Sequence, residues 1–379
     1  MEKTLVFFLF ILTGYLLKTK FQSKEETLGI KKIILNLALP ATIFMALLSI
    51  EINQQLLLLP VLSLGLNLLL FLSSPWMGRL AGIKKGSAEM RTLRLLIPSL
   101  APGLSCFPFV LEYLGEEGLA KVAMADLGNK MFVLFVLFWV AMLWHRKTSE
   151  EVTPSGTTKP GALLKRFISE PVNLFISAAL LLLALGIDFS SLPLVLQDTL
   201  GRLGGIMTPL VLLFIGLSVK IKREQFRALF ALLSLRAASV FLLVASILFA
   251  TGLSARVEVL LLLCFSLSAC SFWPFAHITT VSRLEEKRRT EEQTFNPAYA
   301  INLLALSFPM STVLILGVLN SGSSLTNPWN LILIGGALGC LGLIVSPNKI
   351  KINSLLKLSP DFRSTVKISR PRKRAAHVK

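Results

Sequence analysis

Acidic residues are scarce in this chain: 21 Asp and Glu stand against 39 Lys and Arg, and charged residues make up only 16% of the sequence. With 54% hydrophobic residues and a mean hydropathy of +0.70, this composition excludes a soluble globular domain. Catalytic patterns are also lacking. There is no H-E-x-x-H, no G-x-S-x-G, no phosphate-binding loop and no pair of Asp-rich motifs, so we do not expect an enzyme.

Cysteine is equally sparse, with four residues in 379. Cys106, Cys264, Cys270 and Cys340 all lie inside hydrophobic runs and share no metal-ligand or disulfide spacing. We therefore expect them to pack as small apolar side chains. The sequence predicts neither a metal site nor a cofactor.

Long hydrophobic runs dominate what is present. A bilayer-crossing helix needs about 20 apolar residues, and eleven stretches approach or exceed this length. They are residues 4–18, 28–50, 54–76, 93–114, 118–144, 169–187, 193–219, 226–251, 256–281, 296–319 and 328–346. The first run resembles a signal peptide, but no A-x-A-like cleavage site follows it and its stronger positive flank comes after it. We interpret it as the first span.

Lys and Arg alternate between consecutive loops. Five loops are rich in them: Lys18, Lys20 and Lys24; Arg79, Lys84, Lys85, Arg91 and Arg94; Arg146, Lys147, Lys159, Lys165 and Arg166; Lys220, Lys222, Arg223 and Arg227; Arg283, Lys287, Arg288 and Arg289. The intervening loops hold at most one. Positive charge is retained in the cytoplasm during insertion. The pattern predicts a multi-pass protein of the cell membrane (inner or plasma membrane), with the N-terminus outside and the C-terminus inside.

The formal net charge of +18 is spread over these loops and the tail. Membrane lipids, and not nucleic acid, are therefore the expected partners of the basic residues. The tail, residues 347–379, carries ten Lys and Arg. Its cluster at Arg370, Arg372, Lys373 and Arg374 either binds anionic lipid or is an ordinary inside-facing tail, and the second interpretation is favoured.

The polar segment 146–167 separates five spans from the next five. Because five is odd, the second half begins on the opposite side of the membrane, and related halves would be inverted repeats. Two motifs recur in order: Pro40 to Ser49 matches Pro209 to Ser218, and Ser105 to Phe109 matches Ser271 to Phe275. The predicted divisions are residues 1–145 (first repeat), 146–167 (cytoplasmic linker), 168–320 (second repeat), 328–346 (an extra span) and 347–379 (basic cytoplasmic tail).

Prolines mark the fourth and ninth spans. The fourth contains Pro98, Pro102 and Pro108, and the ninth contains Pro274. Proline removes a backbone donor and breaks or kinks a helix. A broken helix at mid-membrane leaves polar groups that must face protein or a cavity, and half-helix N-termini there suit an anion. Ordinary kinks are the alternative. The predicted substrate-binding residues are Ser105, Pro108, Ser271, Pro274 and Asn129.

Ionisable residues within spans are costly unless used or paired. Asp126 and Lys130 share one helix face, as either a self-neutralised pair or an ion-coupling site for H⁺ or Na⁺. His277 is either a packed polar group or a proton relay. Arg236 is expected to snorkel to the cytoplasmic face, the alternative being contact with an anion.

Small residues in the last span allow close helix contact. Gly335 and Gly339 form a small-xxx-small pair, which serves either a homodimer interface or packing within the molecule.

Several segments resemble the auxin efflux carrier family of permeases. They are Gly14-Tyr15-Leu16-Leu17, Asn36 to Ala41, Gly115 to Ala120, Asp126 to Asn129, Pro171, Gly186, Leu192-Pro193, Thr208 to Leu210, and Gly216 to Ser218. The resemblance covers about residues 1–320. It implies a ten-span inverted-repeat fold like that of sodium/proton antiporters and bile-acid symporters. Spans 1, 2, 6 and 7 would form a scaffold, and the rest a moving domain with crossed broken helices 4 and 9.

Relatives in that family export auxin, malonate or other organic anions. The chain departs from the family in two ways, and the first leaves the substrate class open. The family often has an Asn near each crossover, where this chain reads Ala101-Pro102-Gly103 and Pro274 to His277, and the eleventh span exceeds the family's ten.

The predicted fold class is an all-α integral membrane protein with 5+5 inverted-repeat helices plus one extra C-terminal helix. The predicted function is secondary active transport of a small organic anion, such as a carboxylate, by alternating access. A non-transporting sensor or scaffold, or a channel, is the alternative.

Overall fold

The computed structural model describes residues 2–21, 23–50, 54–148, 170–218, 226–288 and 293–347. Within these ranges the chain is helical, and one isolated β-bridge joins Leu100 to Cys270. Nearly all of the predicted linker 146–167 lies outside the described residues, as does the tail beyond residue 347.

The helices follow the predicted spans. They are α1 (Glu2–Leu17), α2 (Lys24–Ile33), the π-helix η1 (Ile34–Ala38), α3 (Leu39–Leu48), α4 (Gln54–Leu80), α5 (Ala88–Leu96), α6 (Pro102–Ser105), α7 (Phe107–Met131), the π-helix η2 (Phe132–Val136), α8 (Leu137–Thr148), α10 (Pro171–Ala184), α11 (Leu194–Gly205), α12 (Met207–Ser218), α13 (Phe226–Thr251), α14 (Arg256–Ser266), α15 (Trp273–Arg288), α16 (Pro297–Asn320) and α17 (Pro328–Val345). The described residues also form two short 3₁₀ helices, η3 (Phe189–Ser191) and η4 (Ser324–Thr326).

Local capping explains several helix starts. Ser23 and Glu26 form a capping box at the start of α2, in which each side chain accepts a hydrogen bond from the other residue's backbone N–H. Asn296 and Asn327 cap α16 and α17 through their side-chain oxygens, and a proline follows each of them at the first helical position.

Seven helices of the described residues are long and apolar enough to cross a membrane, by length and composition. Two shorter apolar helices, Leu5–Leu17 and Pro171–Ala184, add to these. The ninth predicted span, which contains α14 and α15, is interrupted. The fourth predicted span is interrupted after α5. Their pieces fall short of a full crossing, so the seven helices do not test the eleven-span topology, which stays a prediction.

Gly115 separates the fourth and fifth predicted spans. Its φ of 75° lies inside an otherwise continuous run of helix from Phe107 to Thr148. Glycine tolerates this left-handed conformation because it lacks a Cβ. The chain therefore turns at Gly115, between the two predicted spans, although the helices on either side abut without a loop.

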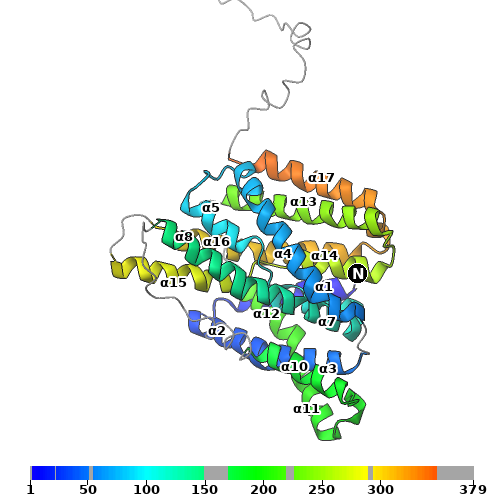
Figure 1. Cartoon of the computed structure of the whole chain (residues 1–379). Coiled ribbons are helices and arrows are strands. Elements are labelled where there is room, and N and C mark those ends of the chain that lie inside the picture. The colour runs from blue at the N-terminus through cyan, green and yellow to red at the C-terminus, as the bar shows by residue number, and fades with distance from the viewer. Residues whose placement is uncertain are drawn as a thin grey trace, which may run out of the picture.

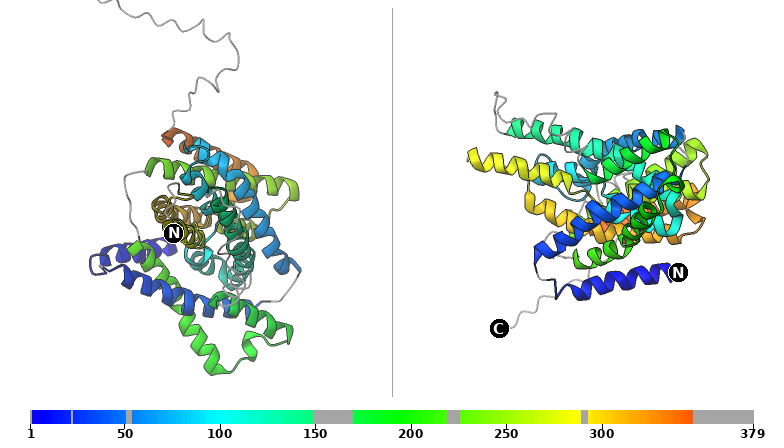
Figure 2. Two further views of the ribbon diagram at one scale, coloured as in Figure 1. Left: turned by 60° about the vertical axis from the view of Figure 1, so that its left-hand side comes forward. Right: turned by 90° about the horizontal axis from the view of Figure 1, so that it is seen from below.

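The helices form two groups. α13 and α17 lie side by side at one end of the molecule, and α2, α3, α10 and α11 lie at the other (Figure 1). α1 lies along one edge (Figure 2) and packs on α12. That contact is close because Gly14 faces the backbone carbonyl of Leu213, and Gly216 faces the carbonyl of Ile11. α5, α14 and the start of α7 lie between the two ends, around the crossing described below.

Gly335, Gly339 and Gly342 of α17 face α13 within the molecule. A Cβ on Gly335 would lie 3.2 Å from the Ala238 carbonyl oxygen of α13, and one on Gly342 would lie 3.0 Å from that of Ala231. Of the two alternatives for the small-residue face, the structure shows intramolecular packing. The opposite face of α17 is exposed: the exposed fraction is 75% for Leu333 and 77% for Ile344.

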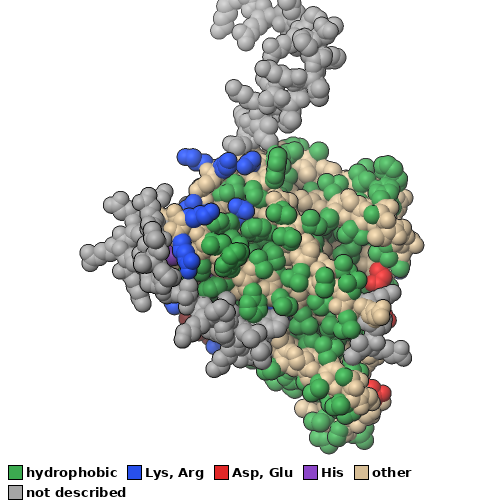
Figure 3. Space-filling view, in the orientation of Figure 1, with side chains coloured by type: hydrophobic (Ala, Val, Ile, Leu, Met, Phe, Trp, Pro, Cys, Tyr) green, Lys and Arg blue, Asp and Glu red, His purple; other side chains and the backbone are tan. Residues whose placement is uncertain are grey.

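The surface fits a lipid environment. Large apolar side chains such as Trp76 and Val313 are exposed, and Figure 3 shows apolar groups spread widely over one face. The visible Lys and Arg gather on one side of this face, and the visible Asp and Glu lie on the other. A broad apolar surface with Lys and Arg gathered on one side of it is typical of an integral membrane protein.

Three of the four cysteines are packed as expected. Cys106, Cys264 and Cys270 are free thiols with buried side chains, whereas Cys340 is exposed on α17. Cys340 is the exception to the packing prediction. Its helix, α17, packs on α13, and Cys340 remains exposed.

Gly128 permits the contact between α7 and α4, and replacing it tests this packing. A Cβ at this position would overlap the Pro60 carbonyl oxygen and the Ser63 hydroxyl. Gly128→Ala should therefore destabilise the protein by about 1–3 kcal/mol, the usual cost of overpacking. Gly65→Ala is the matched control, since a Cβ there meets nothing within 4 Å. Thermal unfolding in detergent measures both, and equal midpoints would contradict the packing.

Candidate functional site

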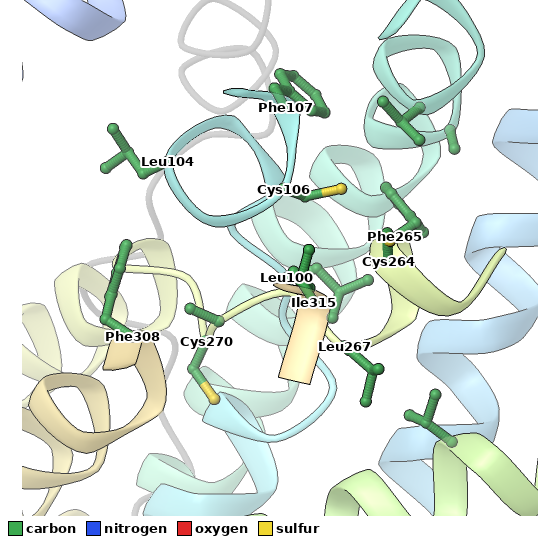
Figure 4. Packing of buried hydrophobic residues seen from close by; sticks show 14 of the residues in the cluster. Leu100, Leu104, Cys106, Phe107, Cys264, Phe265, Leu267, Cys270, Phe308 and Ile315 are labelled. Carbon is green, nitrogen blue, oxygen red and sulfur yellow. The ribbon is translucent and has the colours of Figure 1, made fainter. Parts of the chain in front are cut away.

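Two interrupted helices cross near the centre of the fold. α5 ends at Leu96 and α14 ends at Ser266, and the non-helical segments that follow them run antiparallel. The Ala101 N–H donates to the Ala269 carbonyl at 2.8 Å, and the Ser271 N–H donates to the Ser99 carbonyl at 3.3 Å. Each interrupted segment thus provides hydrogen-bond partners for backbone groups of the other. Figure 4 shows Leu100 and Cys270 at the crossing.

Serine hydroxyls complete this backbone pairing. Ser105 Oγ accepts from the Ala269 N–H at 2.9 Å, and Ser307 Oγ accepts from the Cys270 N–H at 3.2 Å. Ser311 Oγ donates to the Leu267 carbonyl at 2.7 Å. Ser105 was predicted to bind substrate. The structure places it, fully buried, in the crossing, where it is not part of the lining of the cavity described below.

Arg236 of α13 also binds the crossing. Its Nε donates to the Ile97 carbonyl at 3.1 Å and its Nη2 donates to the Ser268 carbonyl at 2.8 Å. The side chain is only 5% exposed. The prediction that Arg236 snorkels to the cytoplasmic face is therefore wrong. Unpaired carbonyls at the ends of two half-helices hold the guanidinium inside the protein.

Asn129 ties α7 to the crossing. Its Oδ1 accepts from the Leu100 N–H at 3.1 Å and its Nδ2 donates to the Leu100 carbonyl at 2.9 Å. The amide thus pairs with both backbone groups of Leu100, as a neighbouring strand would. The same amide donates to Asp126 Oδ1 at 2.8 Å and accepts from Asn67 of α4 at 3.0 Å.

Asp126 and Lys130 form the predicted pair, and a second carboxylate joins them. Lys130 Nζ lies 3.3 Å from Asp126 Oδ2 and 3.2 Å from Glu170 Oε1. It also donates to Asn173 Oδ1 at 3.2 Å. Glu170 and Asn173 stand at the start of α10, so this buried network links α7 to α10.

A cavity of about 330 Å³ opens between these elements. Its polar and charged lining comes from α2, α7, the start of α10 and the segment before α15: Lys31, Asp126, Asn129, Lys130, Glu170 and Ser271. Leu35, Leu39 and Val133 supply apolar walls. This volume is at the lower end of the range for small-molecule sites, which combine apolar walls with a few polar groups.

Lys31 differs from Lys130 in its contacts. Its Nζ lies 3.5 Å from the centroid of the Phe272 ring, a cation–π contact. Within the described residues no carboxylate lies at ion-pair distance from it. Phe272 directly precedes α15, whose first N–H, that of Trp273, donates to Ser271 Oγ at 3.3 Å.

The remaining predicted residues, Pro108, Pro274 and His277, are not part of the cavity lining. Pro108 and Pro274 each occupy the second position of a helix, α7 and α15, where the missing N–H costs little. His277 is buried, with Nε2 3.0 Å from the Val133 carbonyl and its ring edge-on to Phe138. Of the predicted set, Asp126, Asn129, Lys130 and Ser271 line the cavity together.

Sequence reasoning missed Lys31, Glu170 and Phe272. Lys31 falls inside the predicted span 28–50, so the rule that intramembrane charges mark function could have identified it. Glu170 stands at the edge of a span beside the charged linker. Only the fold shows that it reaches Lys130.

Comparison with known proteins gives one informative similarity. No family model matches the chain, so the resemblance to the auxin efflux carrier family stays a prediction. A protein of Methanocaldococcus jannaschii described as an uncharacterized transporter is 25% identical over 266 residues, which cover 68% of this chain and 80% of that protein. This similarity and the apolar helices fit an integral membrane protein of transporter type.

Proposed function

We propose that this protein is a secondary active transporter that moves a small organic anion, such as a carboxylate, across the cell membrane by alternating access. The observation that carries the proposal is the charge distribution of the cavity. The Lys130 ammonium forms ion pairs with both Asp126 and Glu170. The Lys31 ammonium lies over the ring of Phe272, and no carboxylate of the described residues lies at ion-pair distance from it. An anion at Lys31 would supply the missing counter-charge.

The surroundings of Lys31 suit an organic anion. An ammonium over an aromatic ring retains N–H donors for a carboxylate. The start of α15 lies nearby, and the N-terminus of a helix carries a partial positive charge. Leu35, Leu39 and Val133 offer an apolar wall to the hydrocarbon part of the molecule.

Matched proline positions support an inverted repeat of residues 1–145 and 168–320. Pro40 is the second residue of α3 and Pro209 the third of α12, while Pro108 and Pro274 are the second residues of α7 and α15. In this proposal the first, second, sixth and seventh spans form a scaffold, the others move, and α17 is an addition packed on α13. An interruption in both the fourth and ninth spans is in keeping with it.

The cavity would lie between these two parts. Lys31 on α2 and Glu170 before α10 belong to the proposed scaffold, and Lys130 and Phe272 to the proposed moving part. The alternation of Lys and Arg places Lys31 and Glu170 near the cytoplasmic ends of their spans. We therefore propose a cavity open to the cytoplasm, with the N-terminus outside and the C-terminus inside.

Removing the Lys31 ammonium tests the anion site. Lys31→Gln should lower saturable uptake of labelled malonate or indole-3-acetate into proteoliposomes by roughly tenfold or more, as expected for losing a charged hydrogen bond. Lys32→Gln, at the exposed neighbouring position, should leave uptake unchanged.

Three outcomes would count against the proposal. Equal uptake by the Lys31→Gln and Lys32→Gln variants would remove Lys31 from the site. Binding of the anion without flux would favour a sensor or scaffold, and flux that does not saturate would indicate a channel.

Asp126 is the candidate ion-coupling carboxylate, because it is buried beside Asn129 and Lys130. Asp126→Asn keeps the shape of the side chain but removes its charge and its proton site. We expect uptake to lose its response to an imposed pH or sodium gradient, while substrate exchange at equal concentrations continues. Glu258→Gln, at a partly exposed carboxylate paired with Lys121, is the control. A gradient response equal to that of the unmodified protein would exclude Asp126 from coupling.

A further inference from the structure

The crossing brings two helix C-termini together. α5 ends at Leu96 and α14 ends at Ser266; Ile97 is the next residue after α5, and Ser268 lies two residues after the end of α14. The last four carbonyls of a helix lack partners within it. Each C-terminus also carries about half a negative charge from the helix dipole. Two such ends form a site of negative potential inside the protein.

In transporters with interrupted helices, half-helix C-termini and unwound carbonyls are the groups that coordinate Na⁺. Here a side chain occupies that position. Arg236 donates through Nε to Ile97 and through Nη2 to Ser268, so one guanidinium binds one carbonyl from each break. The two breaks are joined through it as well as through the direct contact at Leu100 and Cys270.

The charge of Arg236 has no other counterpart among the described residues. No carboxylate lies within ion-pair distance of it there, and the side chain is 5% exposed. A guanidinium stays protonated in proteins, and a buried charge is strongly unfavourable without compensation. The negative ends of α5 and α14 supply that compensation. An apolar side chain that only filled the same space would need no such compensation.

We propose that Arg236 is a tethered cation that takes the position of a bound Na⁺ at the two half-helix C-termini. The crossing therefore holds together without an inorganic cation. Any coupling to an ion passes through other groups, such as Asp126. This inference stands on the geometry of the crossing and does not depend on the transported substrate.

Thermal unfolding of the full-length protein in detergent tests it. In the Asp126→Asn background, which removes the proposed coupling carboxylate, the midpoint should be the same in NaCl, KCl and choline chloride at equal concentration. Arg236→Ala should lower the midpoint by several degrees, and ethylguanidinium at millimolar concentration should restore most of the loss. Arg227→Ala changes an exposed arginine of the same helix, and it should show neither the loss nor the rescue.

Two further variants separate charge from packing. Arg236→Met fills the space without charge, and it should be destabilised with no recovery in ethylguanidinium. Arg236→Lys keeps the charge but cannot span both carbonyls, so its midpoint should lie between those of the unmodified protein and Arg236→Met.

A higher midpoint of the Asp126→Asn variant in NaCl than in KCl and choline would overturn the proposal. A folded Arg236→Ala variant that ignores ethylguanidinium would do the same. If Arg236→Ala does not fold, the salt series on the Asp126→Asn variant and the ranking of the Arg236→Lys and Arg236→Met variants decide the question. Because the readout is stability, loss of transport in any variant would not bear on the result.

Discussion

The need to satisfy backbone polar groups away from water governs the centre of this protein. Lipid offers no hydrogen bonds, so an interrupted helix inside a membrane is stable only if its free N–H and C=O groups find partners in the protein. Here two interruptions are placed against each other, which lets Ala101 and Ser271 donate across the crossing. Asn129 and Ser105 serve further groups of the same two segments. The cavity lies beside this arrangement, and its lining includes residues of both breaks.

The parts predictable from sequence are those that depend on local or periodic signals. Hydrophobic length located the helices to within a few residues, and Pro102 and Pro274 indicated where two of them are interrupted. The i, i+4 spacing of Asp126 and Lys130 predicted a contact that the structure contains. These features depend on neighbours within one or two helical turns, which the sequence shows directly.

Features that depend on distant partners were missed or misread. Arg236 was expected at the membrane surface, because its two carbonyl partners, on Ile97 and Ser268, come from other helices and carry no side-chain signature. Glu170 stands 40 positions after Lys130, beyond the predicted linker, and only the folded chain joins them. Ser105 matched Ser271 by position in the two halves, yet one is bound within the crossing and the other lines the cavity.

The sharing of Lys130 between two carboxylates has a mechanical consequence. One partner, Asp126, travels on the same helix, whereas the other, Glu170, belongs to the start of α10. Displacement of α7 along α10 would thus separate only the second contact, and the ammonium would remain neutralised by its own helix throughout. Removing every partner of a buried charge carries one of the largest free-energy costs in a protein interior. Because Lys130 keeps Asp126 as a partner, sliding of α7 along α10 does not incur that penalty. The electrostatic barrier between two packed positions of these helices is therefore low.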